Sequence, residues 1–130
     1  MTDLELVNAA REVMQKAYSP YSGFCVGAAL LTTDGELFCG CNVENVSFSV
    51  TCCAERSALF AAVSSGKRSF SAIAIAGGHK GKISSTCPPC GVCRQALSEF
   101  CNKDFRILLA TDDGYEEHTL AELLPLNFNL

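Results

Sequence analysis

The sequence has no tryptophan, only two histidines and no cluster of lysines and arginines. Nucleic-acid-binding proteins normally carry a basic face, so a net charge of −4 argues against a nucleic-acid partner. No apolar run reaches the length of about 18 residues that a membrane helix needs. Asp3 and Glu5 stand where a secretory signal would be basic. We therefore expect a soluble, cytosolic protein with no membrane partner.

The chain is too short for two domains of ordinary size. With 130 residues, of which 48% are hydrophobic, it is long enough to bury one real core. Its composition shows no internal repeat and no low-complexity segment. We expect one domain that spans residues 1–130.

Cysteine is the residue that the sequence has in excess. Nine cysteines could form disulfides in a small secreted chain, but the count is odd and no signal peptide is recognised. Both features favour reduced thiols and metal binding over a disulfide framework.

Two short stretches carry the chemistry. The first contains Cys53 and Glu55 in a C-x-E pattern, and the second contains Cys90 and Cys93 in P-C-x-x-C. This pair of patterns is the thiolate-rich form of the zinc deaminase signature, in which a nearby Glu moves protons without binding the metal. A catalytic zinc takes three protein ligands and leaves a fourth position for water. Cys53, Cys90 and Cys93 supply three.

The spacing also suggests how the side chains are placed. If Thr51 caps a helix, Cys53 falls in the first turn, where unpaired N–H groups and the helix dipole stabilise a thiolate. Cys90 and Cys93 lie one turn apart at the start of a second helix, so both sulfurs can face one point. Glu55 would project beside the metal, as suits a carboxylate that acts on bound water.

Two arginines lie next to the expected ligands. Three thiolates on Zn²⁺ leave one net negative charge, which makes the metal a poorer Lewis acid. Arg56 lies three residues after Cys53, and Arg94 directly follows Cys93. Each could place a guanidinium near the sulfurs and withdraw charge from them. The (i, i+3) geometry favours Arg56 as the larger contributor.

Alternating strand and helix patterns predict an α/β fold. We expect a three-layer α/β/α domain around one mixed five-stranded sheet. The expected helices cover 2–17, 52–65, 90–101 and 119–124, and the expected strands cover 26–32, 36–41, 70–76, 106–110 and 115–118. Residues 77–82 are expected to form a flexible loop.

The helix expected at 52–65 is apolar on most sides. A domain of this size can hardly bury such a helix alone, which suggests oligomerisation. A helix that is merely central within one chain explains the pattern equally well.

Five segments in order and in register resemble the small homotetrameric cytidine deaminases. They cover nearly the whole chain: YSPYSGF at 18–24, VGAA at 26–29, NVEN at 42–45, CAER at 53–56 and PCGVCRQ at 89–95. The resemblance implies a zinc-dependent enzyme, with one Zn²⁺ per subunit, that hydrolyses cytidine and deoxycytidine to uridine and deoxyuridine in pyrimidine salvage. Zinc-bound hydroxide would attack C4 while Glu55 carries the protons.

The resemblance also implies roles for residues around the metal. Phe24 would form a wall of the pyrimidine pocket, Asn42 and Glu44 would bind the sugar hydroxyls, and the N–H of Ala54 would meet the base carbonyl. The loop at Phe48 and the tail at Phe128 would complete the site of a neighbouring subunit in a homotetramer.

The sequence departs from the family pattern at three positions. Phe48 replaces the usual aromatic hydroxyl, Pro88 replaces the usual Ser or Thr, and Cys87 is unexpected.

Several alternatives remain open on the sequence. Cys87, Cys90 and Cys93, completed by Cys53, could form a closed structural zinc site or an iron–sulfur site. Neither accounts for Glu55 or the NVEN loop. A polynucleotide, nucleotide or aminonucleoside-antibiotic deaminase shares the metal pattern, and a non-catalytic zinc-stapled interaction module is a further possibility.

Overall fold

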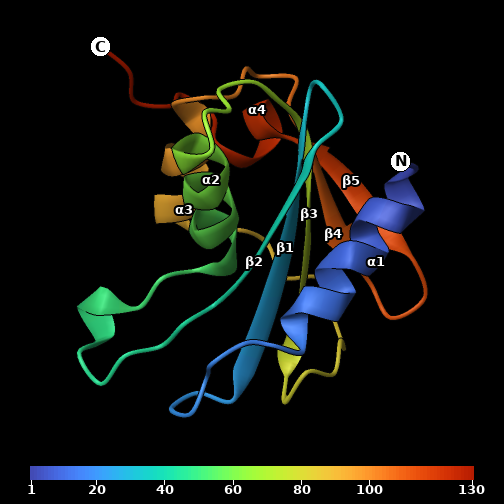
Figure 1. Cartoon of the computed structure of the whole chain (residues 1–130), viewed down its shortest axis with the longest axis vertical. Coiled ribbons are helices and arrows are strands. Elements are labelled where there is room, and N and C mark those ends of the chain that lie inside the picture. The colour runs from blue at the N-terminus through green and yellow to red at the C-terminus, as the bar shows by residue number, and fades with distance from the viewer.

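A single mixed sheet forms the middle layer of the structure, a computed structural model that describes residues 1–130 (Figure 1). The strand order is β2-β1-β3-β4-β5, and only β3 and β4 pair in parallel. The strands are β1 (Phe24–Thr32), β2 (Leu37–Cys41), β3 (Phe70–His79), β4 (Arg106–Ala110) and β5 (Tyr115–Thr119). The expected mixed five-stranded sheet is confirmed.

Helices cover both faces of this sheet. In Figure 1, α1 lies on one side and α2 and α3 lie on the other, which confirms the three-layer α/β/α arrangement. The helices are α1 (Asp3–Met14), α2 (Ala54–Ser64), α3 (Gly91–Ser98) and α4 (Leu120–Leu123), with a short 3-10 helix η1 (Phe48–Val50). None of them combines the length and apolar character that crossing a membrane requires.

The central strand β3 is buried on both faces because its side chains alternate between two cores. Ile73 and Ile75 belong to the core that includes α2 and α3, whereas Ala72 and Ala74 belong to the core that includes α1. The side chains are small toward α1 and large toward α2. Because both faces are buried, the segment is one continuous apolar run.

The helix that carries the first half of the metal motif packs very closely on strand β2. A Cβ on Gly40 would lie 2.5 Å from the nitrogen of Ala58 and 2.8 Å from the oxygen of Ala54. Only a residue without a side chain fits between β2 and α2 at this point. The contact fixes the beginning of α2 against the sheet.

Several element boundaries differ from the sequence-based expectation. The first helix ends at Met14, and α3 ends at Ser98. Residues 77–79 are not loop, because β3 continues to His79 and pairs with the start of β1. Glycine there allows the backbone of Lys82 to pack against β3, since a Cβ on Gly78 would lie 1.9 Å from the oxygen of Lys82. Glycine in this stretch therefore indicated tight packing rather than flexibility.

Threonine side chains cap the first and the last helix of the chain. Thr2 accepts a hydrogen bond from the N–H of Glu5 at 3.1 Å. Thr119 and Glu122 form a complete capping box at the start of α4. These local sequence signals therefore place the starts of α1 and α4 correctly.

Candidate metal centre and active site

Two helices on the same face of the sheet each begin directly after a cysteine. Cys53 is the N-cap residue of α2 and Cys90 is the N-cap residue of α3, and neither helix start has a side-chain cap. The expectation that Thr51 caps α2 is wrong. Its hydroxyl accepts instead from the N–H of Asn45 at 3.2 Å, because the chain stays extended through a bridge between Val43 and Cys52. The positive ends of both helix dipoles therefore face the cysteine sulfurs.

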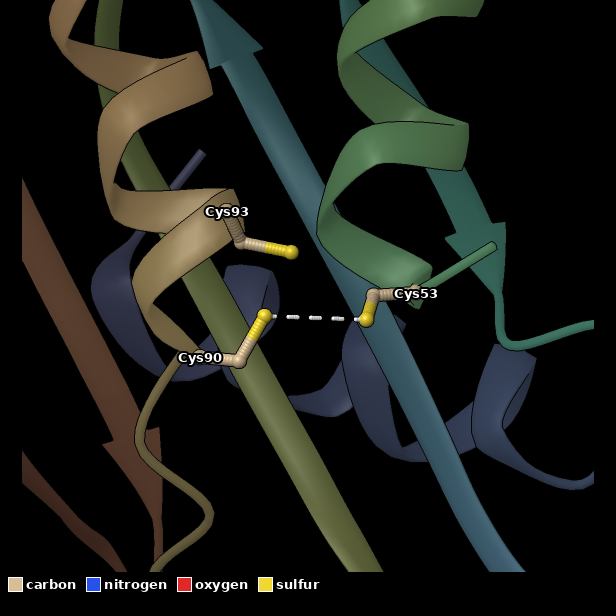
Figure 2. A group of neighbouring side chains, drawn as sticks. All are labelled: Cys53, Cys90 and Cys93. Carbon is tan, nitrogen blue, oxygen red and sulfur yellow. Dashed lines mark hydrogen bonds between the residues drawn. The ribbon is translucent and has the colours of Figure 1, made fainter. Parts of the chain in front are cut away.

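The structure brings three cysteine sulfurs to one point. The Sγ atoms of Cys53, Cys90 and Cys93 all lie within 4.8 Å of one another, and those of Cys53 and Cys90 are 3.8 Å apart (Figure 2). In a tetrahedral zinc site with Zn–S bonds of about 2.3 Å, two sulfurs lie about 3.8 Å apart. The spacing and the thiol donors both fit zinc.

One arginine stabilises the charge on these sulfurs. Hydrogen bonds from Cys93 and from Arg56 hold the pKa of the Cys53 thiol well below its usual range. Arg56 Nη2 donates to Cys53 Sγ at 3.3 Å, as its (i, i+3) position predicts. Its buried Nε atom has no hydrogen-bond partner. The hydrogen bond from Nη2 therefore holds the guanidinium against the sulfur of Cys53.

Glu55 is the one buried carboxylate of the chain. It is 4% exposed, and burial raises the pKa of its carboxyl to about 7, with a further contribution from the nearby Cys53 thiolate. A carboxyl with a pKa near neutrality can both accept and return a proton at physiological pH. Its position in the first turn of α2 places it beside the three sulfurs.

Cys87 lies near this carboxylate but outside the group of three sulfurs. Burial, and then the charge of Glu55, raise the pKa of its thiol to about 12. Its position outside this group favours the set of three cysteines over a four-cysteine structural site.

Asn42 is almost fully buried and holds the backbone around Phe24. Its Oδ1 accepts from the N–H of Val26 at 2.9 Å, and its Nδ2 donates to the oxygen of Phe24 at 2.8 Å. Phe24 itself opens strand β1 and is 39% exposed. Phe24, which is expected at the base, and Asn42, which is expected at the sugar, are thus joined by a hydrogen bond.

Glu44 is fixed by a turn whose role the sequence analysis did not identify. Its Oε1 accepts from the N–H groups of Tyr21 and Ser22 at 3.0 and 3.1 Å, and its Oε2 accepts from the hydroxyl of Ser22. The Ser22 hydroxyl is the main reason that the pKa of the Glu44 carboxyl lies below its usual range. The available signal was a serine two residues before Phe24, where a hydroxyl can bond nearby backbone.

The two remaining aromatic candidates stand away from the body of the chain. Phe48 is 75% exposed and packs edge-on against Tyr21, and Phe128 is 71% exposed. Figure 1 shows η1 and the C-terminal tail extending outward on the side of α2 and α3. A hollow of about 360 Å³ lies between Phe48 and the turn that holds Glu44.

Arg94 makes its hydrogen bonds to backbone oxygens and none to the sulfurs. Its Nε donates to the oxygen of Pro89 and its Nη1 to the oxygen of Leu123, both at 2.6 Å. Arg94 therefore ties the metal loop to the C-terminal segment.

Ala54 takes the first position of α2 and is completely buried. The first N–H groups of a helix have no acceptor within the helix. The N–H of Ala54 therefore has no acceptor within α2.

Comparison with known proteins finds the same pattern elsewhere. Residues 1–109 match the family model described as the cytidine and deoxycytidylate deaminase zinc-binding region. The chain is 47% identical over 126 residues to a cytidine deaminase of Sporosarcina psychrophila, covering 96% of this chain and 90% of the relative. A cytidine deaminase of Halalkalibacterium halodurans is 46% identical over 121 residues, which cover 92% and 89% of the two chains. The crystal structure of cytidine deaminase from Burkholderia pseudomallei superposes with a TM-score of 0.91 at 42% identity, covering 98% of this chain and all of that one.

Proposed function

This chain belongs to the family of zinc-binding cytidine and deoxycytidylate deaminases, and we propose that it hydrolyses cytidine and deoxycytidine to uridine and deoxyuridine with release of ammonia. The observation that carries the proposal is the placement of the buried Glu55 beside three converging cysteine sulfurs. An open three-thiol site with an adjacent carboxylate fits hydrolytic deamination and does not fit a closed structural zinc site.

Cys53, Cys90 and Cys93 would hold one zinc ion per chain. Bound there, zinc supplies a water molecule whose pKa is lowered toward 7. The helix starts behind Cys53 and Cys90, together with the guanidinium of Arg56, offset the negative charge of the three thiolates.

Glu55 performs the proton transfers. It accepts one proton of the attacking water and delivers it to N3 of the pyrimidine, and it then transfers the second proton of that water, from the new hydroxyl on C4, to the leaving amine. One carboxylate can serve each step because its pKa of about 7 lies close to the operating pH. Its burial also keeps bulk water away from the transferred proton.

The substrate is held on the side of the site formed by the start of β1 and residues 42–44. Phe24 forms a wall for the pyrimidine, Asn42 and Glu44 bind the sugar, and the N–H of Ala54 meets the base carbonyl. Glu44 is ionised and half-buried, so its charge would repel a phosphate on the sugar. This supports a free nucleoside as the substrate, rather than a nucleotide.

The active unit is a homotetramer with shared sites. Phe48 and Phe128 lie on projecting segments and are largely exposed, and Phe60 on α2 is 50% exposed. Packing of identical chains in closed symmetry would bury these side chains and bring Phe48 and Phe128 to the site of a neighbouring chain. Deamination of free nucleosides in such an assembly fits a role in cytosolic pyrimidine salvage.

One experiment tests the activity directly. Purified protein with measured zinc content is incubated with cytidine, and ammonia release is followed, with Glu55→Gln as the matched variant. We expect one zinc per chain in both proteins and a loss of at least roughly 10²- to 10⁴-fold in turnover for the variant. Failure of the zinc-loaded protein to release ammonia from either cytidine or deoxycytidine would rule out the proposal.

A further inference from the structure

In the turn before β1, the hydroxyl of Ser22 connects Phe24, which is proposed to contact the base, to Glu44, which is proposed to bind the sugar. Ser22 Oγ donates to Glu44 Oε2, because an ionised carboxylate can only accept. The lone pairs of the same oxygen accept from the N–H of Phe24 at 3.0 Å. The direction of both hydrogen bonds is therefore fixed, and the hydroxyl links Phe24 to Glu44.

The backbone of Phe24 is held at its other end as well. Its carbonyl oxygen accepts from Asn42 Nδ2, so side chains fix both its N–H and its C=O. Around the turn, the N–H of Gly23 bonds to the oxygen of Ser19 at 2.9 Å, and the N–H of Lys80 bonds to the oxygen of Gly23. The turn is thus a rigid support.

The hydrogen-bonding capacity of Glu44 leaves room for one more partner. A carboxylate offers about four acceptor directions, and three are already used by the N–H groups of Tyr21 and Ser22 and by the Ser22 hydroxyl. Glu44 lines the same hollow as Tyr21, Phe48 and Thr51. One incoming hydroxyl can therefore be bound, in a direction that the turn determines.

We propose that Ser22 is a positioning residue that fixes the carboxylate of Glu44 relative to Phe24, and so sets the distance at which the site accepts the sugar and the base of one nucleoside. This inference rests on the proposed function, because it takes Glu44 as the partner of the sugar. Ser22 does not touch the reacting carbon. It acts on binding through Glu44 and leaves the proton transfers of Glu55 unchanged.

The test is a double-mutant cycle with Ser22→Ala, Glu44→Ala and the double variant, measured as KM and kcat for cytidine and as Kd for uridine by calorimetry. We expect Ser22→Ala to raise KM and Kd about three- to tenfold, the net effect of one hydrogen bond, with kcat within twofold of wild type. In the Glu44→Ala background the same change should have almost no effect, because the group that it positions is gone.

Two further variants separate positioning from a general effect on the loop. Ser22→Thr keeps the hydroxyl at an exposed site and should restore wild-type KM. Ser64→Ala removes a hydroxyl that bonds only to its own helix, at the opposite end of α2, and should change nothing. Zinc content and melting temperature are measured for each protein to confirm that it is folded.

The outcomes distinguish this inference from the function on which it rests. An equal rise in KM in the wild-type and Glu44→Ala backgrounds, or a fall in kcat alone, would overturn the role of Ser22 while deamination stands. If the zinc-loaded protein binds uridine but does not deaminate cytidine, the proposed function fails, and the coupling of Ser22 to Glu44 is decided by the uridine affinities.

Discussion

Arg56 Nη2 lies 3.3 Å from the Sγ of Cys53, one helical turn away on α2. The charged donor reduces the electron density that the thiolate would give to a bound metal. The sulfur cluster is therefore less negative than three thiolates alone would make it.

Arg56→Gln should lower kcat for cytidine by about 10- to 100-fold, the usual cost of losing a partner of a metal ligand, while the protein still binds zinc. Steady-state kinetics and metal analysis measure the two effects. Arg68→Gln is the matched control, since Arg68 donates only to the backbone oxygens of Val63 and Lys67. Unchanged kcat in Arg56→Gln would mean that the helix dipoles suffice.

Cys87→Ala should keep both the zinc and the activity, because the partly buried thiol of Cys87 lies outside the group of three sulfurs. Cys53→Ala should lose the metal, since only two sulfurs then remain. Zinc per chain is measured in both variants after dialysis. A zinc-free Cys87→Ala protein beside a zinc-loaded Cys53→Ala protein would show that the ligand set is different.

Removal of residues 128–130 should raise KM while each chain keeps its zinc, because Phe128 would line the site of a neighbouring chain. The tail is held to α3 through a hydrogen bond from Gln95 Nε2 to the oxygen of Phe128. A chain that lacks only Leu130 serves as the control. Sedimentation measures the assembly, and a fully active monomer would contradict the shared site.

Mixing provides a second test of the same arrangement. Chains without residues 128–130 are combined with inactive Glu55→Gln chains and allowed to exchange subunits. Some activity should return, because one site can then draw Glu55 and Phe128 from different chains. No recovery after demonstrated exchange would mean that each chain completes its own site.

Arg106→Gln should lower the stability of the chain near neutral pH. Arg106 bonds both Asp3 and Glu117 and holds the pKa of each carboxyl below its usual range. A carboxyl with a lowered folded-state pKa adds stability above its unfolded pKa of about 4, and loses it as pH falls through the folded value. All three side chains are more than a third exposed, so we expect an effect of up to about 1 kcal/mol.

Urea unfolding at a series of pH values measures this effect. The difference between wild type and Arg106→Gln should be largest near pH 7 and shrink as the pH falls from about 4 through the lowered folded-state pKa values, below which the carboxyls are protonated in both proteins. Arg68→Gln should show no such trend. A difference that stays constant across this range would contradict the assigned cause.

Sequence reasoning was most informative where the spacing within one element fixes the geometry. The separation of Cys90 from Cys93, and of Cys53 from Arg56, is one helical turn, so the helices themselves bring these side chains together. The capping box of Thr119 and Glu122 likewise depends on a spacing within one element.

The rest of the site depends on contacts between segments distant in the sequence. Arg94 bonds to the oxygen of Leu123, and Ser22 bonds to Glu44, neither of which any local period predicts. Gly78 was read as flexible because glycine permits both loops and close packing, and only the approach of Lys82 decides between them.

The three cysteines lie on two helices separated along the chain by strand β3, and the sequence separation between Cys53 and Cys90 is 37 residues. The complete ligand set exists only after the sheet has formed, so zinc would bind the folded chain far better than the unfolded one. By mass action, each tenfold excess of free zinc over its dissociation constant adds up to about 1.4 kcal/mol to the free energy of unfolding. The amount of folded protein, and not only its turnover, would then follow the supply of zinc.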